Sequence, residues 1–188
     1  GFAEILKHSI IKDKKFFNWL EKNSRLIFLK KNKELTYAIK KSCEIKIYFV
    51  TKDLNEKGLR MILNFGHTFA HAIEVRNNYS KNITHGEAVL TGMILAIKLS
   101  ILKKNCTYKI LNQVRNLYVK NNLTHSLKNV SNSKWIQSLI PFLKQDKKND
   151  DDKINFLLLK DIGKADLPNK FKISTSDLRR HCKTISQY

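Results

Sequence analysis

The chain has 188 residues, of which 42% are hydrophobic, and it contains only 2 Pro and 6 Gly. This composition excludes a disordered protein and favours a mainly helical domain with one well-filled core or two small ones. The formal net charge is +20, from 36 Lys and Arg against 16 Asp and Glu. Because the lysines are scattered over the whole chain, beside much Asn and Ile, we attribute this charge to compositional drift and expect no nucleic-acid partner.

The spacing of apolar residues predicts four helices in the first part of the chain. They cover residues 2–11, 16–21, 32–51 and 59–75, with a break at 13–15 and a joint at Gly58. After a polar turn over 77–84, Thr84 and Glu87 have the spacing of a capping box and predict the start of another helix. Residues 88–99 are apolar almost all round, which predicts the central buried helix.

The second part of the chain changes character after two more predicted helices, at 108–120 and 133–143. A charged loop at 147–153 precedes a β-type run at 154–159, a turn at 161–163 and a partner strand at 171–173. A last helix is predicted to start near Ser174 or Ser176. We therefore predict one mainly α domain over residues 1–188 with a small β-hairpin.

One face of the predicted helix 59–75 collects polar side chains of several kinds. At about 100° per residue, five of them fall within about 40° of one line, and Glu56 joins them if the helix begins before Gly58. The five are Arg60, Asn64, His67, His71 and Glu74. Two histidines one turn apart are a common divalent-metal site, and His85 and Glu87 can add ligands, while Arg60 suits a carboxylate or phosphate. The alternative is a pair of half-buried structural histidines bonded to Glu74 and the backbone.

Several blocks of sequence resemble the 3-dehydroquinate synthase family. The longest is EKGLRMILNFGHTFAHAIE at 56–74, followed by HGEAV at 85–89 with Gly92 and Met93. The others are GFAEILK at 1–7, SCEIK at 42–46 and DKK at 146–148. They occur in order along nearly the whole chain, so together they are far more specific than any one block. Ala70 departs from the glycine that the family usually has.

The resemblance implies a helical metal- and substrate-binding C-terminal domain with defined site residues. Glu4, His67 and His85 would be the ligands of Zn²⁺ (or Co²⁺), and His71 would contact the substrate instead of the metal. The groups implied to hold the substrate are Lys7, Lys46, Arg60, Asn64 and one of Lys147 and Lys148, with Glu56 beside them.

The family's reaction converts 3-deoxy-D-arabino-heptulosonate 7-phosphate, a small phosphorylated sugar acid, into 3-dehydroquinate and phosphate. The resemblance thus implies a carbon–oxygen lyase of the shikimate pathway, which leads to the aromatic amino acids, acting with NAD and as a homodimer when full length. The 188 residues contain no glycine-rich phosphate loop after a strand, so NAD would be bound by an N-terminal domain. Gly1 opens directly into a helical pattern, so we expect a fragment, and because that fragment would lack the NAD site we expect it to be inactive alone.

Three other functions compete with this one. Another sugar-phosphate cyclase would use the same chemistry, but Arg60 and Asn64 fit a substrate carboxylate; the blocks at 4–7 and 146–148 argue against a metal-dependent polyol dehydrogenase. A basic RNA-binding module is disfavoured because no aromatic residues interleave with Lys clusters.

Cellular location and the remaining histidines follow from simpler patterns. Three widely spaced cysteines indicate a reducing compartment, no signal peptide is visible, and the apolar run at 88–97 falls short of the roughly 18 residues that span a bilayer. We expect a cytoplasmic protein without a membrane partner. His8, His125 and His181 lack a second ligand at matching spacing, so we expect them on the surface.

Overall fold

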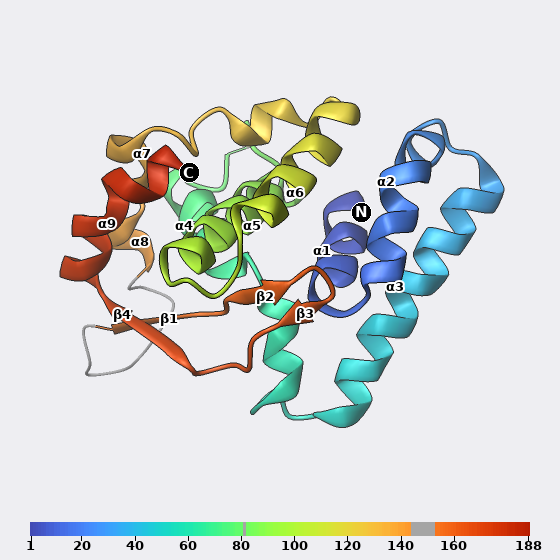
Figure 1. Ribbon diagram of the computed structural model, residues 1–188, viewed down its shortest axis with the longest axis horizontal. Helices are drawn as coiled ribbons and strands as arrows, with labels where there is room; N and C mark the ends of the chain where they lie inside the picture. Colours follow the sequence, from blue (N-terminus) through green and yellow to red (C-terminus); the bar gives the residue numbers. More distant parts are fainter. Residues whose placement is uncertain (81, 144–152) are drawn as a thin grey trace.

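Helices dominate the computed structural model, which describes residues 1–80, 82–143 and 153–188. The first three helices are α1 (Phe2–Lys12), α2 (Lys14–Phe28) and α3 (Asn32–Lys52). Figure 1 shows them packed together on one side of the molecule, with α4 (His67–Arg76) and α5 (His85–Leu102) at its centre. Asp13 separates α1 from α2 and caps α2 by accepting a hydrogen bond from the Phe16 amide at 2.9 Å. The predicted break at 13–15 is thus reduced to Asp13, since α2 already begins at Lys14, and α2 continues past residue 21 to Phe28.

The prediction of one helix over residues 59–75 is wrong. The chain instead forms a 3₁₀ helix, η1 (Leu59–Asn64), and then the separate helix α4 (His67–Arg76). Gly66 lies between them at φ 81°, and a Cβ there would be 2.8 Å from both Cγ and N of Met93. The left-handed turn and the close approach to Met93 both require glycine. Arg60 and Asn64 are therefore not on the same helix as His67.

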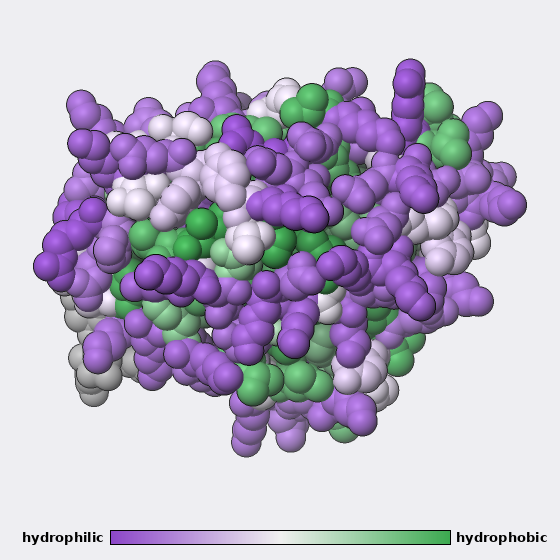
Figure 2. Space-filling model, viewed as in Figure 1, coloured by the Kyte–Doolittle hydropathy of each residue, from purple (hydrophilic) through white to green (hydrophobic). Residues whose placement is uncertain are grey.

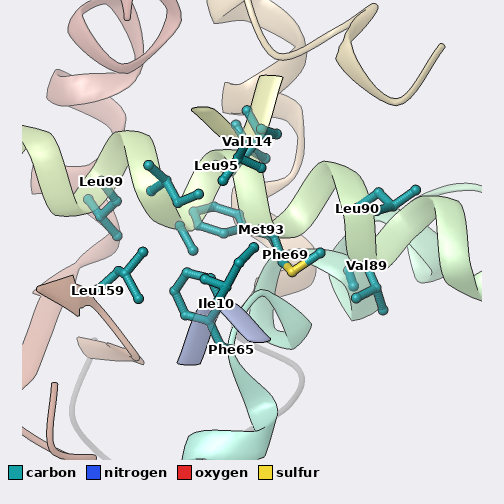
Figure 3. Packing of buried hydrophobic residues seen from close by; sticks show 14 of the residues in the cluster. Ile10, Phe65, Phe69, Val89, Leu90, Met93, Leu95, Leu99, Val114 and Leu159 are labelled. Atoms are coloured by element: carbon teal, nitrogen blue, oxygen red, sulfur yellow. The ribbon is translucent and has the colours of Figure 1, made fainter. Parts of the chain in front are cut away.

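Helix α5 (His85–Leu102) is the central buried helix, as predicted. Its capping box is present: Thr84 accepts from the Glu87 amide, and the Glu87 carboxylate accepts from the Thr84 amide at 2.7 Å. Figure 3 shows Phe65, Phe69 and Ile10 packed against the side chain of Met93. By length and mean hydropathy, 1.4, α5 resembles a membrane span, but 72% of that stretch is buried inside the protein. This burial identifies α5 as the core helix of the fold.

The remaining helices surround α5. They are α6 (Tyr108–Lys120), the 3₁₀ helix η2 (Thr124–Leu127), α7 (Ser133–Ser138), α8 (Ile140–Leu143) and α9 (Thr175–Gln187). Helix α6 has the predicted bounds, and Ser174 caps α9 as one of the two predicted starts. The predicted helix 133–143 is interrupted at Leu139, so it forms two short helices instead of one.

The C-terminal strands form two small antiparallel ladders. They are β1 (Lys153–Phe156), β2 (Leu159–Asp161), β3 (Lys164–Ala165) and β4 (Phe171–Ser174). β1 pairs with β4, with Ile154 opposite Ile173, and β2 forms a hairpin with β3. Gly163, at φ 83° in the hairpin turn, donates to the Ile10 carbonyl at 2.7 Å and joins the hairpin to α1. The mainly α fold with a small β-hairpin is confirmed, although the run 154–159 divides between two strands.

The visible face of the molecule is mostly polar. Figure 2 shows hydrophilic side chains over most of this face, interrupted by separate hydrophobic patches.

Candidate metal and anion-binding site

Three side chains from separate parts of the sequence converge at one end of α5. Glu4 lies in the first turn of α1, His67 is the first residue of α4 and His85 is the first residue of α5. Each offers one ligand atom, and these atoms lie within 4.8 Å of one another. One carboxylate and two imidazoles match the ligand chemistry of catalytic zinc sites, which leave positions open for substrate. The three predicted metal ligands are thus brought together.

The carboxylate of Glu4 shows that this cluster fits a cation. Its Oε2 accepts from the Lys7 ammonium at 2.7 Å, while its buried Oε1 has no hydrogen-bond partner among the described residues. Burial is the largest influence and raises the pKa of Glu4, but the charge and hydrogen bond of Lys7, together with the smaller effects of His67 and His8, lower it overall. Although the Glu4 side chain is 40% exposed, its Oε1 atom is buried and unpaired among the described residues, and such an atom favours a further positive or donating partner. Oε1 is also the oxygen nearest to His67 Nε2, at 3.8 Å.

The two imidazoles are held in orientations suited to a ligand role. His67 Nδ1 lies 3.4 Å from the Phe65 carbonyl oxygen, and His85 Nδ1 lies 2.9 Å from Glu74 Oε1. Oxygen acceptors at Nδ1 favour the tautomer in which Nε2 carries the lone pair. Burial, followed by the Lys7 charge, lowers the pKa of His67 to about 4, so its ring is neutral. Glu74, which we considered as a partner of the 67/71 pair, orients His85.

A cavity of about 170 Å³ beside the cluster collects the predicted cationic groups. Its lining residues are Glu4, Lys7, His8, Lys46, Glu56, Arg60, Leu63 and Asn64. The cations come from three elements: Lys7 from α1, Lys46 from α3 and Arg60 from η1. Lys7 is 2% exposed, and its burial lowers the pKa of its ammonium. The three cations outnumber the two carboxylates of the lining, Glu4 and Glu56, and the remaining positive charge favours an anionic ligand.

The loop that carries Glu56 and Arg60 is organised by Asp53, a residue that the sequence reasoning missed. The carboxylate of Asp53 accepts from the backbone amides of Lys57 at 3.1 Å, Gly58 at 2.8 Å and Arg60 at 3.0 Å. These amides, that of Gly58 first, lower the pKa of Asp53 and keep it ionised. Asp five residues before Gly is the available sequence signal for such a turn, but it is a weak one.

Glu56 contacts both of the predicted substrate-binding residues of η1. Its Oε1 accepts from Asn64 Nδ2 at 2.8 Å, and its Oε2 lies 3.6 Å from Arg60 Nε. Glu56 therefore joins the group through a loop, at φ 53°, and not through an extension of a helix. The predicted grouping is present, although its geometric basis was wrong.

A second cavity of about 310 Å³ adjoins the first at Glu56 and Asn64. His67 and His71 line it, and their ring centroids are 5.7 Å apart. Its other lining residues are Met61, Thr68, Asn155, Leu157, Pro168 and Asn169. The wall from the C-terminal strands was not predicted, because no local motif marks it. There Asn155 Nδ2 donates to Asn169 Oδ1 at 2.5 Å.

Four further expectations have different outcomes. Lys147 and Lys148 lie outside the described residues. Glu87 is used by the capping box and by His125, at 2.7 Å, so it adds no ligand to the cluster. The side chain of His125 is on the surface, as expected, with 53% exposed. The expectation for His8 is wrong: it is 4% exposed, because α1 packs this residue against α3.

Comparison with known proteins connects this site to one family. The sequence model described as "3-dehydroquinate synthase C-terminal" matches residues 1–149. The 3-dehydroquinate synthase of Pelagibacter ubique is 40% identical over 178 residues, which is 95% of this chain and 48% of that protein. That of Endomicrobium trichonymphae is 44% identical over 169 residues, or 88% and 44% of the two chains. The chain spans about half the length of the relatives it matches.

Solved structures show the same fold at lower sequence identity. A 2-epi-5-epi-valiolone synthase from Streptomyces hygroscopicus subsp. jinggangensis, with NAD⁺ and Zn²⁺ bound, matches 99% of this chain and 50% of its own, with a TM-score of 0.77 and 23% identity. A 2-deoxy-scyllo-inosose synthase complexed with carbaglucose-6-phosphate, NAD⁺ and Co²⁺ matches 98% and 51%, with a TM-score of 0.77 and 24% identity.

Proposed function

The chain belongs to the 3-dehydroquinate synthase family, and from this premise we propose that its 188 residues are the metal- and substrate-binding half of such an enzyme. The reaction proposed is the conversion of 3-deoxy-D-arabino-heptulosonate 7-phosphate into 3-dehydroquinate and phosphate. That activity makes it a carbon–oxygen lyase of the shikimate pathway. The observation that carries the proposal is the convergence of Glu4, His67 and His85 beside a cavity lined by three cations.

The metal part of the proposal rests on the donor set. Glu4, His67 and His85 would hold Zn²⁺ or Co²⁺, the ions present in the two structural neighbours. A divalent ion held there would supply Lewis-acid polarisation of a substrate oxygen and a fixed point for orientation. Within the chain itself, Glu74 would orient His85 through its 2.9 Å contact, and Lys7 would keep Glu4 ionised.

The substrate part rests on the two adjoining cavities. Lys7, Lys46 and Arg60 would bind the anionic groups of a phosphorylated sugar acid, and Glu56 would orient Arg60. Asn64, at the junction of the cavities, would hydrogen-bond the substrate, and His71 would face it from the larger cavity. Several charged contacts made at once would fix the orientation of the bound substrate. A fixed orientation lowers the barrier to reaction. Lys147 or Lys148 stays a predicted additional contact.

The NAD that the reaction needs would be held by a nucleotide-binding half, which the 188 residues do not supply. The relatives are about twice as long as the matched region, which supports this division. The isolated chain is therefore predicted to be inactive. The homodimer and the cytoplasmic location also stay predictions.

Sequence identity favours dehydroquinate synthase over the other sugar-phosphate cyclases. The relatives at 40% and 44% identity are 3-dehydroquinate synthases, whereas the cyclases matched by structure are 23% and 24% identical. Arg60 and Asn64 provide the groups that would recognise the carboxylate of the sugar acid.

Metal binding is the direct test of the site. Titration of the chain with Co²⁺, followed by visible absorption, is expected to give a spectrum of low-symmetry coordination by one carboxylate and two imidazoles. Glu4→Ala and His67→Ala should each weaken Co²⁺ binding by roughly 100-fold or more, since changes outside the ligand shell already cost 10–100-fold. His181→Ala, which removes a histidine on α9, is the matched control. Equal Co²⁺ affinity of all four proteins would contradict the metal assignment.

Measurement of turnover tests whether the reaction needs a separate nucleotide-binding half. The chain with NAD, Co²⁺ and the sugar acid phosphate is expected to release no phosphate. Addition of the N-terminal half of the Endomicrobium trichonymphae relative, prepared separately, should restore release if the two halves assemble. Phosphate release by the isolated chain would overturn the prediction of inactivity.

A further inference from the structure

A buried hydrogen bond crosses the interface between α1 and α3 next to the anion cavity. His8 on α1 and Ser42 on α3 are 4% and 7% exposed, and His8 Nδ1 lies 2.7 Å from Ser42 Oγ. The two residues are 34 positions apart, so the bond fixes the relative placement of two helices. Buried polar pairs of this kind specify a unique packing arrangement, because separation leaves both groups without partners.

The helices joined by this bond are those that carry two of the three cations. Lys7 is adjacent to His8 on α1, and Lys46 follows Ser42 by one helical turn on α3. Lys7, Lys46 and the His8 ring all line the cavity of about 170 Å³. The bond is therefore one residue from one cation and one turn from the other.

Two ammonium groups that line one small cavity repel each other, and only Lys7 has a carboxylate partner in the lining, Glu4 at 2.7 Å. A fixed spacing between α1 and α3 therefore matters for how Lys7 and Lys46 meet an anion. Burial, followed by the charge of Lys7, lowers the pKa of His8 to about 4. His8 is therefore neutral near pH 7 and adds no third charge, while its bond to Ser42 resists the separation of α1 from α3.

We propose that His8 and Ser42 form a positioning pair that holds Lys7 and Lys46 at the spacing required by one phosphate or carboxylate group. The inference rests on the proposed function, because it assigns an anion to this cavity. His8 acts through the two lysines and, in this role, need not touch the ligand.

Inorganic phosphate is the probe for this inference, and its affinity for the full chain is measured by calorimetry. His8→Leu keeps the apolar volume but removes the bond, and is expected to weaken phosphate binding roughly tenfold, the equivalent of one lost oriented hydrogen bond. His8→Asn, which can still bond Ser42, should retain most of the affinity. Ser42→Ala should reproduce the loss with little change in volume, and the double variant His8→Leu/Ser42→Ala should lose no more than either single variant.

Two controls separate positioning from general destabilisation. Co²⁺ affinity should fall much less than phosphate affinity in Ser42→Ala, because the pair acts on Glu4 only indirectly, through the 2.7 Å contact between Glu4 and Lys7. Tyr118→Phe removes a buried 2.9 Å bond to the Leu90 carbonyl; neither residue lines the cavity, so the change should lower thermal stability without changing phosphate affinity.

The outcomes distinguish the two proposals. If the wild-type chain binds no phosphate, the anion cavity fails and the positioning pair fails with it. If the wild type binds phosphate and the His8 and Ser42 variants bind it equally well, only the positioning pair is overturned. Parallel loss of phosphate binding, Co²⁺ binding and thermal stability in Ser42→Ala would also overturn it, in favour of a purely structural role.

Discussion

Buried charged and polar side chains near the two ends of α5 differ in the partners that they contact. At the first end, the buried Lys7 is paired with the Glu4 carboxylate at 2.7 Å. Toward the other end, Lys98 is fully buried, and its ammonium donates to the Val130 carbonyl at 2.6 Å. Among the described residues, no salt bridge includes Lys98. The positive charge of Lys7 is thus balanced by a carboxylate. The positive charge of Lys98 is opposed only by a carbonyl dipole among the described residues.

Polar satisfaction differs in the same direction. In the core, Ser100 Oγ donates to the Ala96 carbonyl at 2.7 Å and accepts from the Leu159 amide at 2.9 Å. At the site, the buried Glu4 Oε1 has no hydrogen-bond partner among the described residues. A core reaches its lowest free energy when every buried polar atom is paired, whereas a binding site leaves groups for its ligand. Asn121 Oδ1, Ser126 Oγ and Asn155 Oδ1 also lack partners among the described residues, so the candidate cation site rests mainly on the convergence of Glu4, His67 and His85.

The substitution with the largest expected effect disrupts the close contact between α4 and α5, which supports both regions. A Cβ on Gly92 would lie 2.2 Å from the Gly66 carbonyl oxygen and 3.0 Å from the Ala70 nitrogen, both backbone atoms. Gly92→Ala should therefore lower the free energy of unfolding by about 3 kcal/mol or more, because the helices must separate. Urea unfolding monitored by circular dichroism measures this loss.

Gly86→Ala is the matched control on the same helix. Its Cβ would lie 3.8 Å from the Ala3 Cβ, an ordinary contact, so stability should stay equal or rise by up to about 1 kcal/mol. Equal stability of the Gly92→Ala and Gly86→Ala variants would show that the close approach of α4 and α5 is not required.

The prediction with the next largest effect concerns the buried ammonium of Lys98, which has no carboxylate partner among the described residues. Burial lowers the pKa of this ammonium to about 8 from 10.5. Between these two pH values the unfolded chain binds more protons than the folded chain, so the contribution of Lys98 to stability rises with pH. Relative to Lys98→Met, which has no such titration, the wild type should gain up to about 3 kcal/mol from pH 8 to pH 10.5.

Urea unfolding of both proteins across that pH range measures the difference. Because all other titrating groups are shared, their contributions cancel between wild type and variant. Parallel stability profiles would mean that water or a further partner solvates Lys98.

The smallest expected effect concerns the cap that joins core and site. Thr84→Ala removes the N-cap of α5 and should lower the free energy of unfolding by about 1 kcal/mol. Since His85 is the next residue, Co²⁺ affinity should fall by a few-fold as well. Thr51→Ala, near the exposed end of α3, should change stability by about 0.5 kcal/mol at most. A loss of stability without any loss of Co²⁺ affinity would separate the cap from the site.

The sequence predicted the secondary structure best where a pattern of apolar residues lies within one long helix. Hydrophobic periodicity located α1, α3, α5 and α6, because these helices are long and each presents an apolar face or core. It failed at residues 59–75, where Gly66 permits a left-handed turn that periodicity does not detect. It also failed at His8, whose burial depends on a helix 34 positions further along.

Local patterns, with five blocks in order, were enough to predict the helical class of the fold and the family, and they named the candidate ligand residues. Only the tertiary structure decided which nitrogen and oxygen atoms meet, that Asp53 organises the turn before Arg60, and that the C-terminal strands wall the larger cavity. The physical reason is that hydrogen-bond and hydrophobic patterns within one element are local, whereas a site built from α1, α3, η1, α4 and α5 depends on packing between elements that no local pattern encodes.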